Sequence, residues 1–486
     1  MTNLQDLLHN IEPLEIVGRV EGCSNITALS YDSRTVENGG LFFAVVGEVA
    51  DGHNYISKAI QLGAQAVVCE RIPEQIEEGV CYIKVADSNF AMGHVASAFY
   101  GNPSSELKLI GITGTNGKTT TATLLYDLFT TLGYKVGLIS TVIYKIGTES
   151  ITSTHTTPDA IRLAHMMRRM VDEGCDFCFM EVSSHAIAQH RIEGLKFDGA
   201  IFSNITHDHL DYHKTFSEYI KVKKRLFDSL PKGAFALTNL DDRNGRVMVQ
   251  NCVANIQSYS LRSMADFRAK VVEIHFNGML LKLDGEELWV KFIGRFNAYN
   301  ILAAYATAKL LGVEKSDILV ALSTLHSVSG RFEYMTADNG TTIIIDYAHT
   351  PDALESVIAT IEEIRTQSQD LYVVCGCGGD RDHDKRPEMA RIATKYATLS
   401  IFTSDNPRTE DPEAILNDMM SGINGTSVKY LRITDRAEAI KTAVMLSKGG
   451  DIILIAGKGH ETYQIIGTKR HHFDDREAVR EALKMK

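Results

Sequence analysis

An apolar run that breaks into a glycine-rich turn carries the first recognisable chemistry of this chain. Residues 109–120 read Leu-Ile-Gly-Ile-Thr-Gly-Thr-Asn-Gly-Lys-Thr-Thr. In such a turn the backbone N–H groups converge on an anion, and the helix that follows presents its positive end. Lys118 would add a point charge for the β- and γ-phosphates of a nucleotide, and the hydroxyl of Thr119 would face Mg²⁺. The strict pattern has glycine where Ile112 stands, so this is a variant phosphate loop; the alternative is an ordinary strand-to-helix turn.

Acidic and histidine side chains follow the next apolar runs. Glu181 closes the run Phe-Cys-Phe-Met-Glu, and residues 203–213 read Ser-Asn-Ile-Thr-His-Asp-His-Leu-Asp-Tyr-His. A carboxylate at the end of a neighbouring strand could hold Mg²⁺ directly or through water. Zinc is the alternative, but the sequence has no His-Glu-x-x-His helix and no paired cysteine set. Mg²⁺ beside a nucleotide is therefore the simpler interpretation.

The elements that must position these residues are those of parallel α/β sheets. Apolar runs alternate with helical patterns along most of the chain, and turn-rich segments at 101–105 and 327–330 interrupt them. The fold class is therefore α/β with three domains. The predicted domains are a small α/β domain at 1–100, a central parallel-sheet domain of phosphate-loop type at 101–329, and a Rossmann-like α/β domain at 330–486. The predicted strands are 40–46, 64–69, 136–141, 177–182, 199–204, 234–239, 342–346, 371–375, 399–403 and 451–456, and the predicted helices include 53–62, 122–132 and 298–311.

Composition limits the classes of function. The 486 residues carry a formal net charge of −11, which argues against a broad nucleic-acid-binding face but allows a local pocket for phosphates. The eight cysteines show neither a zinc-finger nor a secreted disulfide spacing, which favours a reducing, cytoplasmic setting. Residues 1–14 lack a basic-then-apolar signal, and no stretch approaches the roughly 18 apolar residues of a membrane helix, so we expect a soluble protein.

These motifs, together with three further ones, resemble those of the Mur ligases, cytoplasmic enzymes that add amino acids to the peptidoglycan precursor. The further motifs are Gly-Arg-Phe-Asn-Ala-Tyr-Asn-Ile-Leu at 294–302, Gly-Arg-Phe-Glu at 330–333 and Asp-Tyr-Ala-His-Thr-Pro at 346–351, and the resemblance spans almost the whole chain. It implies that ATP is bound by Gly114, Thr115, Asn116, Gly117, Lys118, Thr119 and Thr120, with Asn297 on adenine and with Arg331 and Asp346 on phosphate and ribose.

The resemblance also implies two Mg²⁺ ions and a modified lysine. Their ligands would be Thr119, Glu181, His209 and a carbamylated Lys223, and the catalytic set would be Lys118, Lys223 and His209. Lys223 lies in Glu-Tyr-Ile-Lys-Val-Lys-Lys-Arg-Leu-Phe at 218–227, with Lys221 and Lys224 as neighbours. Carbamylation requires an uncharged amine in a shielded site, so from the residues alone a solvated basic helix face is the alternative.

The first domain and two central loops would hold the uridine-nucleotide substrate. Ser-Tyr-Asp-Ser-Arg-Thr at 30–35 and the segment 42–53 resemble the family's uridine-nucleotide site, with Tyr31, Ser33, Glu48, Val49 and Ala50 lining it. Thr-His-Thr-Thr-Pro at 154–158 and the segment 183–191 match the loops that hold the muramoyl dipeptide, with contacts from His155, Thr156, Thr157, Ser183, Gln189 and Arg191. For any one of these serines and threonines, helix capping is the alternative role.

The third domain would choose the amino acid. Its Asp-Asn-Pro-Arg core at 405–408 resembles the signature of ligases that add meso-diaminopimelate rather than lysine. Only meso-diaminopimelate carries a distal carboxylate, which Arg408 could grip with its planar fork. The pocket would comprise Arg381, Asp405, Asn406, Pro407, Arg408, Gly457 and Glu461, with Arg381 on a carboxylate and Glu461 on an ammonium. A solvated Pro-Arg turn is the alternative.

The resemblance therefore implies a monomeric ATP-dependent ligase of peptidoglycan synthesis, and so of cell-wall growth, cell shape and division. It would join meso-diaminopimelate to UDP-N-acetylmuramoyl-L-alanyl-D-glutamate through an acyl phosphate, with the third domain closing on the nucleotide and with no nucleic acid or membrane as partner. The competing hypotheses are a sister ligase that adds lysine, a folylpolyglutamate-synthase-like enzyme, a regulatory ATPase without ligase activity, and a silent binding protein that senses cell-wall precursors.

Overall fold

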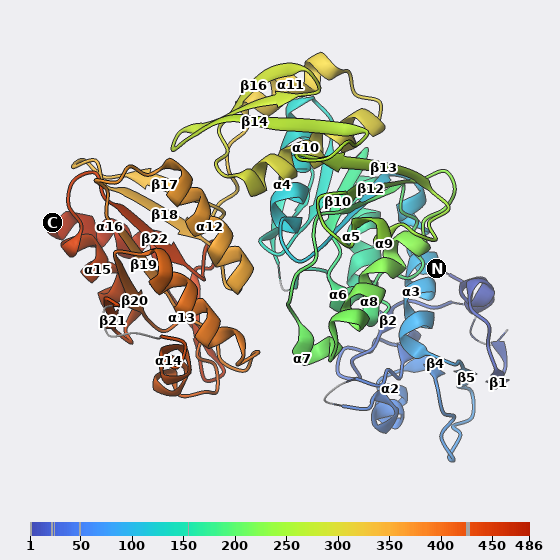
Figure 1. The fold of residues 1–486 in the computed structure, drawn as a ribbon. Coiled ribbons are helices and arrows are strands. Elements are labelled where there is room, and N and C mark those ends of the chain that lie inside the picture. Colours follow the sequence, from blue (N-terminus) through green and yellow to red (C-terminus); the bar gives the residue numbers. More distant parts are fainter. Residues whose placement is uncertain (1, 21–22, 24, 48–49, 154, 424–427) are drawn as a thin grey trace.

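The computed structural model of the chain describes residues 2–20, 23, 25–47, 50–153, 155–423 and 428–486. The fold is α/β: three separate sheets follow one another along the sequence, and helices flank each of them (Figure 1). We refer to the parts built on these sheets as the N-terminal, central and C-terminal units. The two predicted domain boundaries, after residues 100 and 329, fall between the strands of successive sheets.

The N-terminal unit has a five-stranded sheet in the order β1-β5-β4-β3-β2. Strands β2 to β5 are parallel, and β1 pairs with β5 in the antiparallel sense. Its elements are α1 (Leu4–Leu7), η1 (Leu8–Asn10), β1 (Glu15–Val17), β2 (Leu29–Ser30), β3 (Gly40–Phe43), η3 (Gly52–Tyr55), α2 (Ile56–Gln61), β4 (Ala64–Cys69), β5 (Cys81–Lys84) and α3 (Ser88–Phe99). A short 3₁₀ helix, η4 (Pro103–Ser105), leads from α3 into the central unit.

The central unit has an eleven-stranded sheet in the order β16-β15-β14-β13-β12-β11-β6-β10-β7-β8-β9. Its parallel middle lies between two antiparallel edges, β7-β8-β9 and β14-β15-β16. Its strands are β6 (Lys108–Thr113), β7 (Val136–Ile139), β8 (Ile143–Ile146), β9 (Glu149–Thr152), β10 (Phe177–Glu181), β11 (Gly199–Phe202), β12 (Phe235–Asn239), β13 (Asn255–Ser260), β14 (Phe267–His275), β15 (Gly278–Leu283) and β16 (Glu286–Val290). Its helices are α4 (Lys118–Thr131), α5 (Ala160–Asp172), α6 (Ser184–Ala188), α7 (Leu210–His213), α8 (Phe216–Asp228), α9 (Gly245–Met248), α10 (Arg295–Leu310) and α11 (Lys315–Thr324).

The C-terminal unit has a six-stranded sheet in the order β17-β18-β22-β19-β20-β21, parallel except for β17, and a separate hairpin. Its strands are β17 (Glu333–Thr336), β18 (Thr342–Asp346), β19 (Leu371–Cys375), β20 (Leu399–Phe402), β21 (Tyr430–Arg432) and β22 (Ile452–Ala456), and the hairpin is β23 (Tyr463–Ile466) with β24 (Lys469–His472). Its helices are α12 (Pro351–Ile364), α13 (Lys385–Tyr396), α14 (Pro412–Met420), α15 (Arg436–Leu446) and α16 (Asp475–Met485).

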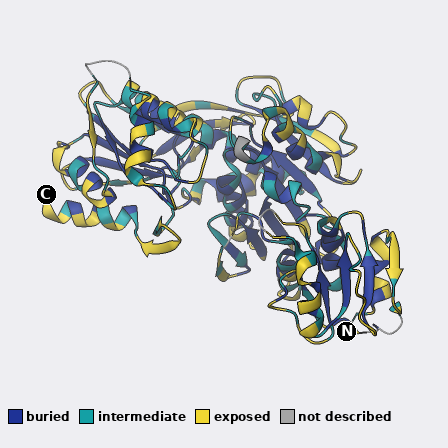
Figure 2. Ribbon diagram, turned by 90° about the horizontal axis from the view of Figure 1, so that it is seen from below, coloured by how far each residue is buried: buried dark blue, intermediate teal, exposed yellow. Residues whose placement is uncertain are grey.

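The central parallel strands of each sheet are buried on both faces, which explains why they are apolar almost throughout (Figure 2). Edge strands such as β16 and β17 alternate between more buried and more exposed residues instead. In the C-terminal unit, Ile344 and Leu454 pack toward α12–α14, whereas Ile343 and Ile453 pack toward α15 and α16. Neighbouring residues of one strand therefore belong to different cores, as the two-residue period of a strand requires. The carboxyl ends of the parallel strands meet at one edge of each sheet, where loops can gather functional side chains.

Most predicted elements are present, with shifted ends. The strands predicted at 64–69, 342–346 and 371–375 have those bounds, whereas β3 stops at Phe43 and the predicted helix 53–62 is a 3₁₀ turn followed by α2. Helix α4 begins at Lys118, directly after the glycine turn, so its positive end faces the phosphate loop. The hairpin edges of the central sheet lay outside the predicted elements, since their register depends on pairing with a sheet that already exists.

All eight cysteines have free thiols. Within the described ranges, no helix combines the length and the apolarity needed to cross a membrane.

A buried ion pair joins the last two helices of the C-terminal unit. Arg436 Nε and Asp475 Oδ1 lie 2.7 Å apart with both side chains fully buried, and Arg436 Nη2 also donates to the carbonyl of Ala456. Removal of one partner leaves an unpaired charge in the core. We expect Asp475→Ala to lower the free energy of unfolding by about 3–5 kcal/mol.

Urea unfolding followed by circular dichroism measures this loss. Glu477→Ala is the matched control on the same helix, because its ion pair with His472 is exposed and should contribute less than about 1 kcal/mol. Equal effects of the two substitutions would contradict the prediction.

Candidate active site

The phosphate loop, residues 114–117, connects β6 to α4 and is held by the segment that follows β11. Thr115 N donates to Asn204 O at 2.8 Å, and Asn116 N donates to Asn204 Oδ1 at 2.9 Å. Gly114 and Gly117 have φ of +151° and +87°, a region that side chains disfavour. A Cβ at Gly114 would lie 2.0 Å from Ser203 Oγ. The loop therefore needs glycine at this position for space as well as for backbone conformation.

Two lysines converge on the loop from different helices. Lys118 Nζ donates to the carbonyls of Gly114 and Thr115 at 2.9 and 2.8 Å, and Lys223 Nζ, from α8, donates to the same Gly114 carbonyl at 2.9 Å. Burial, together with the charge of Lys118, holds the pKa of Lys223 well below its usual range. Burial also lowers the pKa of Lys118, but the carboxylates of Glu181 and Asp208 oppose that shift.

The three candidate lysines of α8 differ in environment. Lys223 is 1% exposed, whereas the side chain of Lys221 is 69% exposed and pairs with Glu218. Lys224 pairs with Asp228. The solvated basic face therefore describes Lys221, and the shielded amine that carbamylation requires is the one on Lys223.

Glu181 is fully buried at the carboxyl end of β10, opposite Ile112 of β6 in the parallel register. Its Oε1 accepts from Thr141 N at 2.7 Å, and its Oε2 accepts from Thr141 Oγ1 at 3.2 Å. The Thr119 hydroxyl faces the C-terminal unit, where Arg331 Nη2 donates to it at 3.1 Å. A carboxylate and a hydroxyl are the oxygen ligands that a hard divalent cation prefers, so the chemistry of these two groups fits Mg²⁺.

His209 has a left-handed backbone with φ of +55° and follows Asp208 in the loop before α7. Its Nε2 lies 3.4 Å from Asp208 Oδ2, and its ring meets that of His185 edge-on, with centroids 4.9 Å apart. Burial lowers its pKa, which favours the neutral imidazole that binds metals. Across the described ranges, no group of three or more His, Cys, Asp and Glu side chains is placed to hold a metal ion.

The residues expected to hold the dipeptide meet beside Glu181. Thr157 Oγ1 donates to the Glu181 carbonyl at 2.8 Å, and Arg191 Nη1 donates to the Thr157 carbonyl at 2.8 Å. Thr156 Oγ1 accepts from Thr141 Oγ1, Gln189 accepts from Arg191, and His155 N donates to Tyr144 OH. Ser183 Oγ accepts from Ala186 N, so this serine does cap α6, as the alternative for it stated.

A cavity of about 580 Å³ lies between the central and C-terminal units, within the usual range for a small-molecule site. Asn116, Gly117 and Thr120 line one wall, and Arg331 and Asp346 line the other. Arg331 lies over the ring of Tyr347, and Asp346 accepts from the backbone N–H groups of Phe332 and Ala348. Burial raises the pKa of Asp346, and the charge of Arg331 opposes that shift.

Asn297 does not line this cavity. It is 1% exposed, and its Nδ2 donates to the Ile293 carbonyl at 2.9 Å. The neighbours Phe296, Tyr299 and Asn300 on the same helix are the ones that line the cavity.

A second group of predicted residues, those expected to form the amino-acid pocket, is connected by polar contacts in the C-terminal unit. Asn406 Nδ2 donates to Glu461 Oε2 at 2.9 Å, and the fully buried Lys458 lies 2.8 Å from the same oxygen. Gly457 has φ of +117°, and a Cβ there would lie 2.5 Å from Asp405 Oδ2. Glu461 therefore already shares its carboxylate with Lys458, a residue absent from our predicted set although it lies between the predicted Gly457 and Glu461.

The two predicted arginines sit on facing loops of this pocket. Arg408 Nη1 donates to the Gly379 carbonyl at 2.8 Å, and Arg381 Nη1 donates to the Asp380 carbonyl at 3.1 Å. Pro407 packs against Gly379, where a Cβ would lie 1.9 Å from the proline carbonyl oxygen.

The N-terminal unit places its predicted residues at sheet edges. Tyr31 is 46% exposed just after β2, and Ser33 is buried in the same turn. The pKa of Tyr31 is raised by burial and by Asp159 of the central unit, so the tyrosine faces that unit. Ala50 is exposed, and Glu48 and Val49 lie outside the described residues.

Sequence reasoning missed several residues that shape the cavity. They include Asn204, which holds the loop, and the cavity-lining Arg262, Arg295, Tyr299, Asn300, Tyr347 and His349. Tyr347 and His349 lie inside a motif that we had quoted, so closer attention to Asp-Tyr-Ala-His-Thr-Pro would have found them.

Comparisons with known proteins bear on the whole chain. Family descriptions match it three times: "Mur ligase family, catalytic domain" at 25–100, "Mur ligase middle domain" at 112–308, and "Mur ligase, glutamate ligase domain" at 330–459. A protein of Bacteroides fragilis named UDP-N-acetylmuramoyl-L-alanyl-D-glutamate--2,6-diaminopimelate ligase is 53% identical over 99% of both chains. A protein of the same name from Geobacillus kaustophilus is 44% identical over 95% of this chain and 96% of its own.

A solved structure titled with the same enzyme name has 33% sequence identity and a TM-score of 0.70, covering 100% of this chain and 99% of its own. Folylpolyglutamate synthase structures share the fold over 76% of this chain at 17–18% identity. The matches to the three Mur ligase domains and the identity over nearly the full length agree with the motifs and the three sheets, and the chain belongs to the Mur ligase family.

Proposed function

We propose that this chain is the ATP-dependent ligase that joins meso-diaminopimelate to UDP-N-acetylmuramoyl-L-alanyl-D-glutamate, giving the tripeptide, ADP and phosphate. The observation that carries the proposal is the cavity with the phosphate loop on one wall and Arg331 and Asp346 on the other. Relatives at 52–54% identity that carry the diaminopimelate ligase name support the choice of substrates. The free cysteines fit a cytoplasmic enzyme, and we propose that it acts as a monomer.

ATP would enter the cavity with its phosphates on the loop. The first turn of α4 needs hydrogen-bond acceptors from outside the helix, and phosphate oxygens would supply them. The ammonium of Lys118 is already held by the carbonyls of Gly114 and Thr115, so it stays beside the loop on which the phosphates would bind. Asp346 would accept from the ribose hydroxyls, and Arg331 would neutralise phosphate charge from the opposite wall.

Thr119, Glu181, His209 and a carbamylated Lys223 would hold two Mg²⁺ ions. When bound, Mg²⁺ neutralises charge on the phosphate oxygens and on the carboxylate that attacks them. Lys223 fits the modification because its buried amine favours the uncharged form, which is the form that reacts with CO₂. The modification would place a carboxylate where an ammonium now lies 2.9 Å from the Gly114 carbonyl.

The reaction would proceed in two steps. A γ-carboxylate oxygen of the D-glutamate residue attacks the γ-phosphorus of ATP, the bond to the bridging oxygen breaks, and ADP leaves. The amine of meso-diaminopimelate then attacks the acyl carbon, phosphate leaves with the C–O bond electrons, and the nitrogen loses a proton. Lys118 and Arg331 stabilise the charge on the transferring group, and His155, Thr156, Thr157, Ser183, Gln189 and Arg191 would hold the dipeptide beside Glu181.

Selectivity would come from the C-terminal unit. The distal end of meso-diaminopimelate carries both a carboxylate and an ammonium, and the pocket offers Arg408 and Arg381 for the first and Glu461 for the second. Asp405 and Asn406 would fix the backbone of the loop, and Gly457 leaves room beside Asp405. Lysine has no distal carboxylate and would leave the Arg408 fork without a partner.

Phosphate release in the presence of both substrates tests this function and the choice of acceptor. We expect turnover with meso-diaminopimelate and little with lysine. Arg408→Ala should raise the KM for diaminopimelate about 10- to 100-fold, the cost of a charged hydrogen-bond pair, while leaving the KM for ATP unchanged. Arg391→Ala, an exposed arginine of α13, is the control.

Equal turnover with lysine would instead favour the sister ligase. A rate of phosphate release that does not depend on the dipeptide or on the amino acid would favour a regulatory ATPase. Absence of phosphate release with all substrates present would favour a binding protein.

The role of Lys223 is tested against its two neighbours on α8. We expect Lys223→Ala to lower kcat by about 10²-fold or more, as for loss of a preorganised electrostatic group. Lys221→Ala and Lys224→Ala should stay within about twofold of the parent because these lysines pair with Glu218 and Asp228 of their own helix and not with the phosphate loop. With ¹³C-bicarbonate, NMR should show one carbamate signal that disappears in Lys223→Ala alone. A fully active Lys223→Ala variant would rule out the metal-ligand role.

A further inference from the structure

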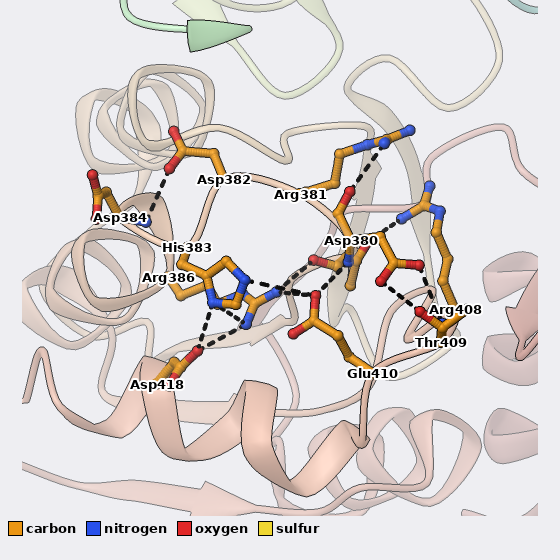
Figure 3. Close-up of polar contacts among 12 residues, drawn as sticks. Asp380, Arg381, Asp382, His383, Asp384, Arg386, Arg408, Thr409, Glu410 and Asp418 are labelled. Carbon is orange, nitrogen blue, oxygen red and sulfur yellow. Dashed lines mark hydrogen bonds and ion pairs between the residues drawn. The ribbon is translucent and has the colours of Figure 1, made fainter. Parts of the chain in front are cut away.

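A fully buried arginine lies beneath the amino-acid pocket and has no part in the chemistry above. Arg386 is in the first turn of α13, and its side chain has 0% exposure. Its Nη2 donates to Glu410 Oε1 at 2.8 Å, and its Nη1 donates to Asp418 Oδ2, on α14, at 2.8 Å. Figure 3 shows the guanidinium between these two carboxylates, below the loops that carry Arg381 and Arg408.

Those two loops are joined to each other by several polar contacts. One is the turn 378–381 after β19, and the other is the segment 406–410 after β20. Gly379 N donates to the Asn406 carbonyl at 2.9 Å, and Thr409 donates through both N and Oγ1 to the Asp380 carboxylate. The two loops therefore form one assembly.

Glu410 connects this assembly to Arg386. Its Oε1 accepts from Asp380 N and from Arg386 Nη2, so a single oxygen joins the turn, the segment and the helix below. Arg386 Nη2 also lies 3.4 Å from the Gly378 carbonyl. Hydrogen bonds from Arg386 hold the pKa of Glu410 below its ordinary value, so Glu410 is ionised at neutral pH.

The assembly fixes the side chain of Arg408, one of the two arginines proposed to bind the distal carboxylate. Arg408 Nη1 donates to the Gly379 carbonyl at 2.8 Å, and a Cβ at Gly378 would lie 2.9 Å from that nitrogen. The backbone of Arg408 has φ of +51° and is held by Ile465 and Gly467 of the hairpin segment. A shift of the 378–381 turn would therefore displace the guanidinium relative to its own backbone.

We propose that Arg386 is a positioning residue that acts through Glu410: it holds the 378–381 turn against the 406–410 segment and so aims Arg408 at the distal carboxylate of the acceptor. This inference rests on the proposed function. A buried pair that served stability alone would be satisfied by Arg386 and Asp418. The link through Glu410 adds a connection to the turn that Arg408 contacts.

The test uses Glu410 rather than Arg386, because Asp418 still pairs with Arg386 when Glu410 is removed. Initial rates of phosphate release are measured with the full-length enzyme while diaminopimelate, lysine and ATP are varied in turn. Glu410→Ala should raise the KM for diaminopimelate about 10- to 100-fold and lower the preference over lysine by a similar factor, since a misplacement of about 1 Å can cost 10²-fold. The KM for ATP should stay within about twofold.

Two further variants separate positioning from general destabilisation. Glu410→Gln keeps an oxygen that can accept from both donors, so it should restore the KM for diaminopimelate to within about threefold of the parent. Glu388→Ala, which removes an exposed carboxylate of α13 paired with Arg391, should change neither KM nor selectivity. Thermal unfolding of each variant reports its stability.

The outcomes are distinct. An unchanged diaminopimelate KM and preference in Glu410→Ala would overturn the positioning role, and so would a loss of kcat with all substrates at constant KM, or a Glu410→Gln variant as impaired as Glu410→Ala. If the parent enzyme itself fails to turn over with diaminopimelate, the proposed function fails and this inference fails with it, a result visible before any variant is made.

Discussion

The nucleotide site depends on one steric constraint, the lack of room for side chains along the phosphate loop. Gly114 is pressed against Ser203, and a Cβ at Gly117 would lie 2.6 Å from Asn300 Oδ1. These two neighbours come from the end of β11 and from α10, and both also line the cavity. The surrounding sheet and helix therefore impose the shape of the loop before any ligand arrives. Such preorganisation is what allows backbone dipoles to stabilise a transferring phosphate without moving.

The same crowding decides the charges of the two lysines. Lys118 and Lys223 both donate to the Gly114 carbonyl, so their ammonium groups compete for one acceptor inside a desolvated site. Burial disfavours the charged form of both lysines, but Glu181 and Asp208 oppose this effect at Lys118, whereas the charge of Lys118 adds to it at Lys223. Lys223 is therefore the lysine whose pKa is held well below its usual range. A modification that made Lys223 anionic would replace its repulsion from the Lys118 ammonium with attraction. This gives a physical reason for the carbamylation that we propose.

The sequence predicted those parts of the site in which the functional side chains and the backbone turn that presents them lie in one short segment. Glycine turns, strand ends and the Asp-Asn-Pro-Arg core are local signals, and they located the phosphate loop, Glu181 and Arg408 at strand ends. It could not predict residues whose role arises from packing between distant segments. Asn204 reaches the phosphate loop from the segment after β11, and Arg386 of α13 reaches Glu410 in the loop before α14. Asn204 lies inside the quoted run 203–213, but nothing in that run indicates a contact with the phosphate loop, and Arg386 lies outside every quoted motif. Asn297 shows that a residue inside a matching motif can be turned into the core while its helix neighbours face the cavity, and its contact with adenine stays a prediction.

Contacts between the central and C-terminal units are polar where the two substrate sites approach one another. Arg331 donates to Thr119, His207 Nε2 lies 3.7 Å from Asp382, and Arg295 pairs with Glu363. Polar contacts of this kind allow relative motion more readily than the apolar packing that also joins the units, where Phe296 lies against Phe332. Phosphate groups in the cavity would lie between cations of both units, Lys118 and Arg331, and would attract both walls. Nucleotide binding would then draw the two units together, and because Asp382 follows Arg381 directly, that approach would carry the amino-acid pocket toward the phosphate loop. The charges would therefore set the order of binding and reaction. Phosphate groups would first draw the two units together, and only then would the acceptor amine reach the acyl carbon.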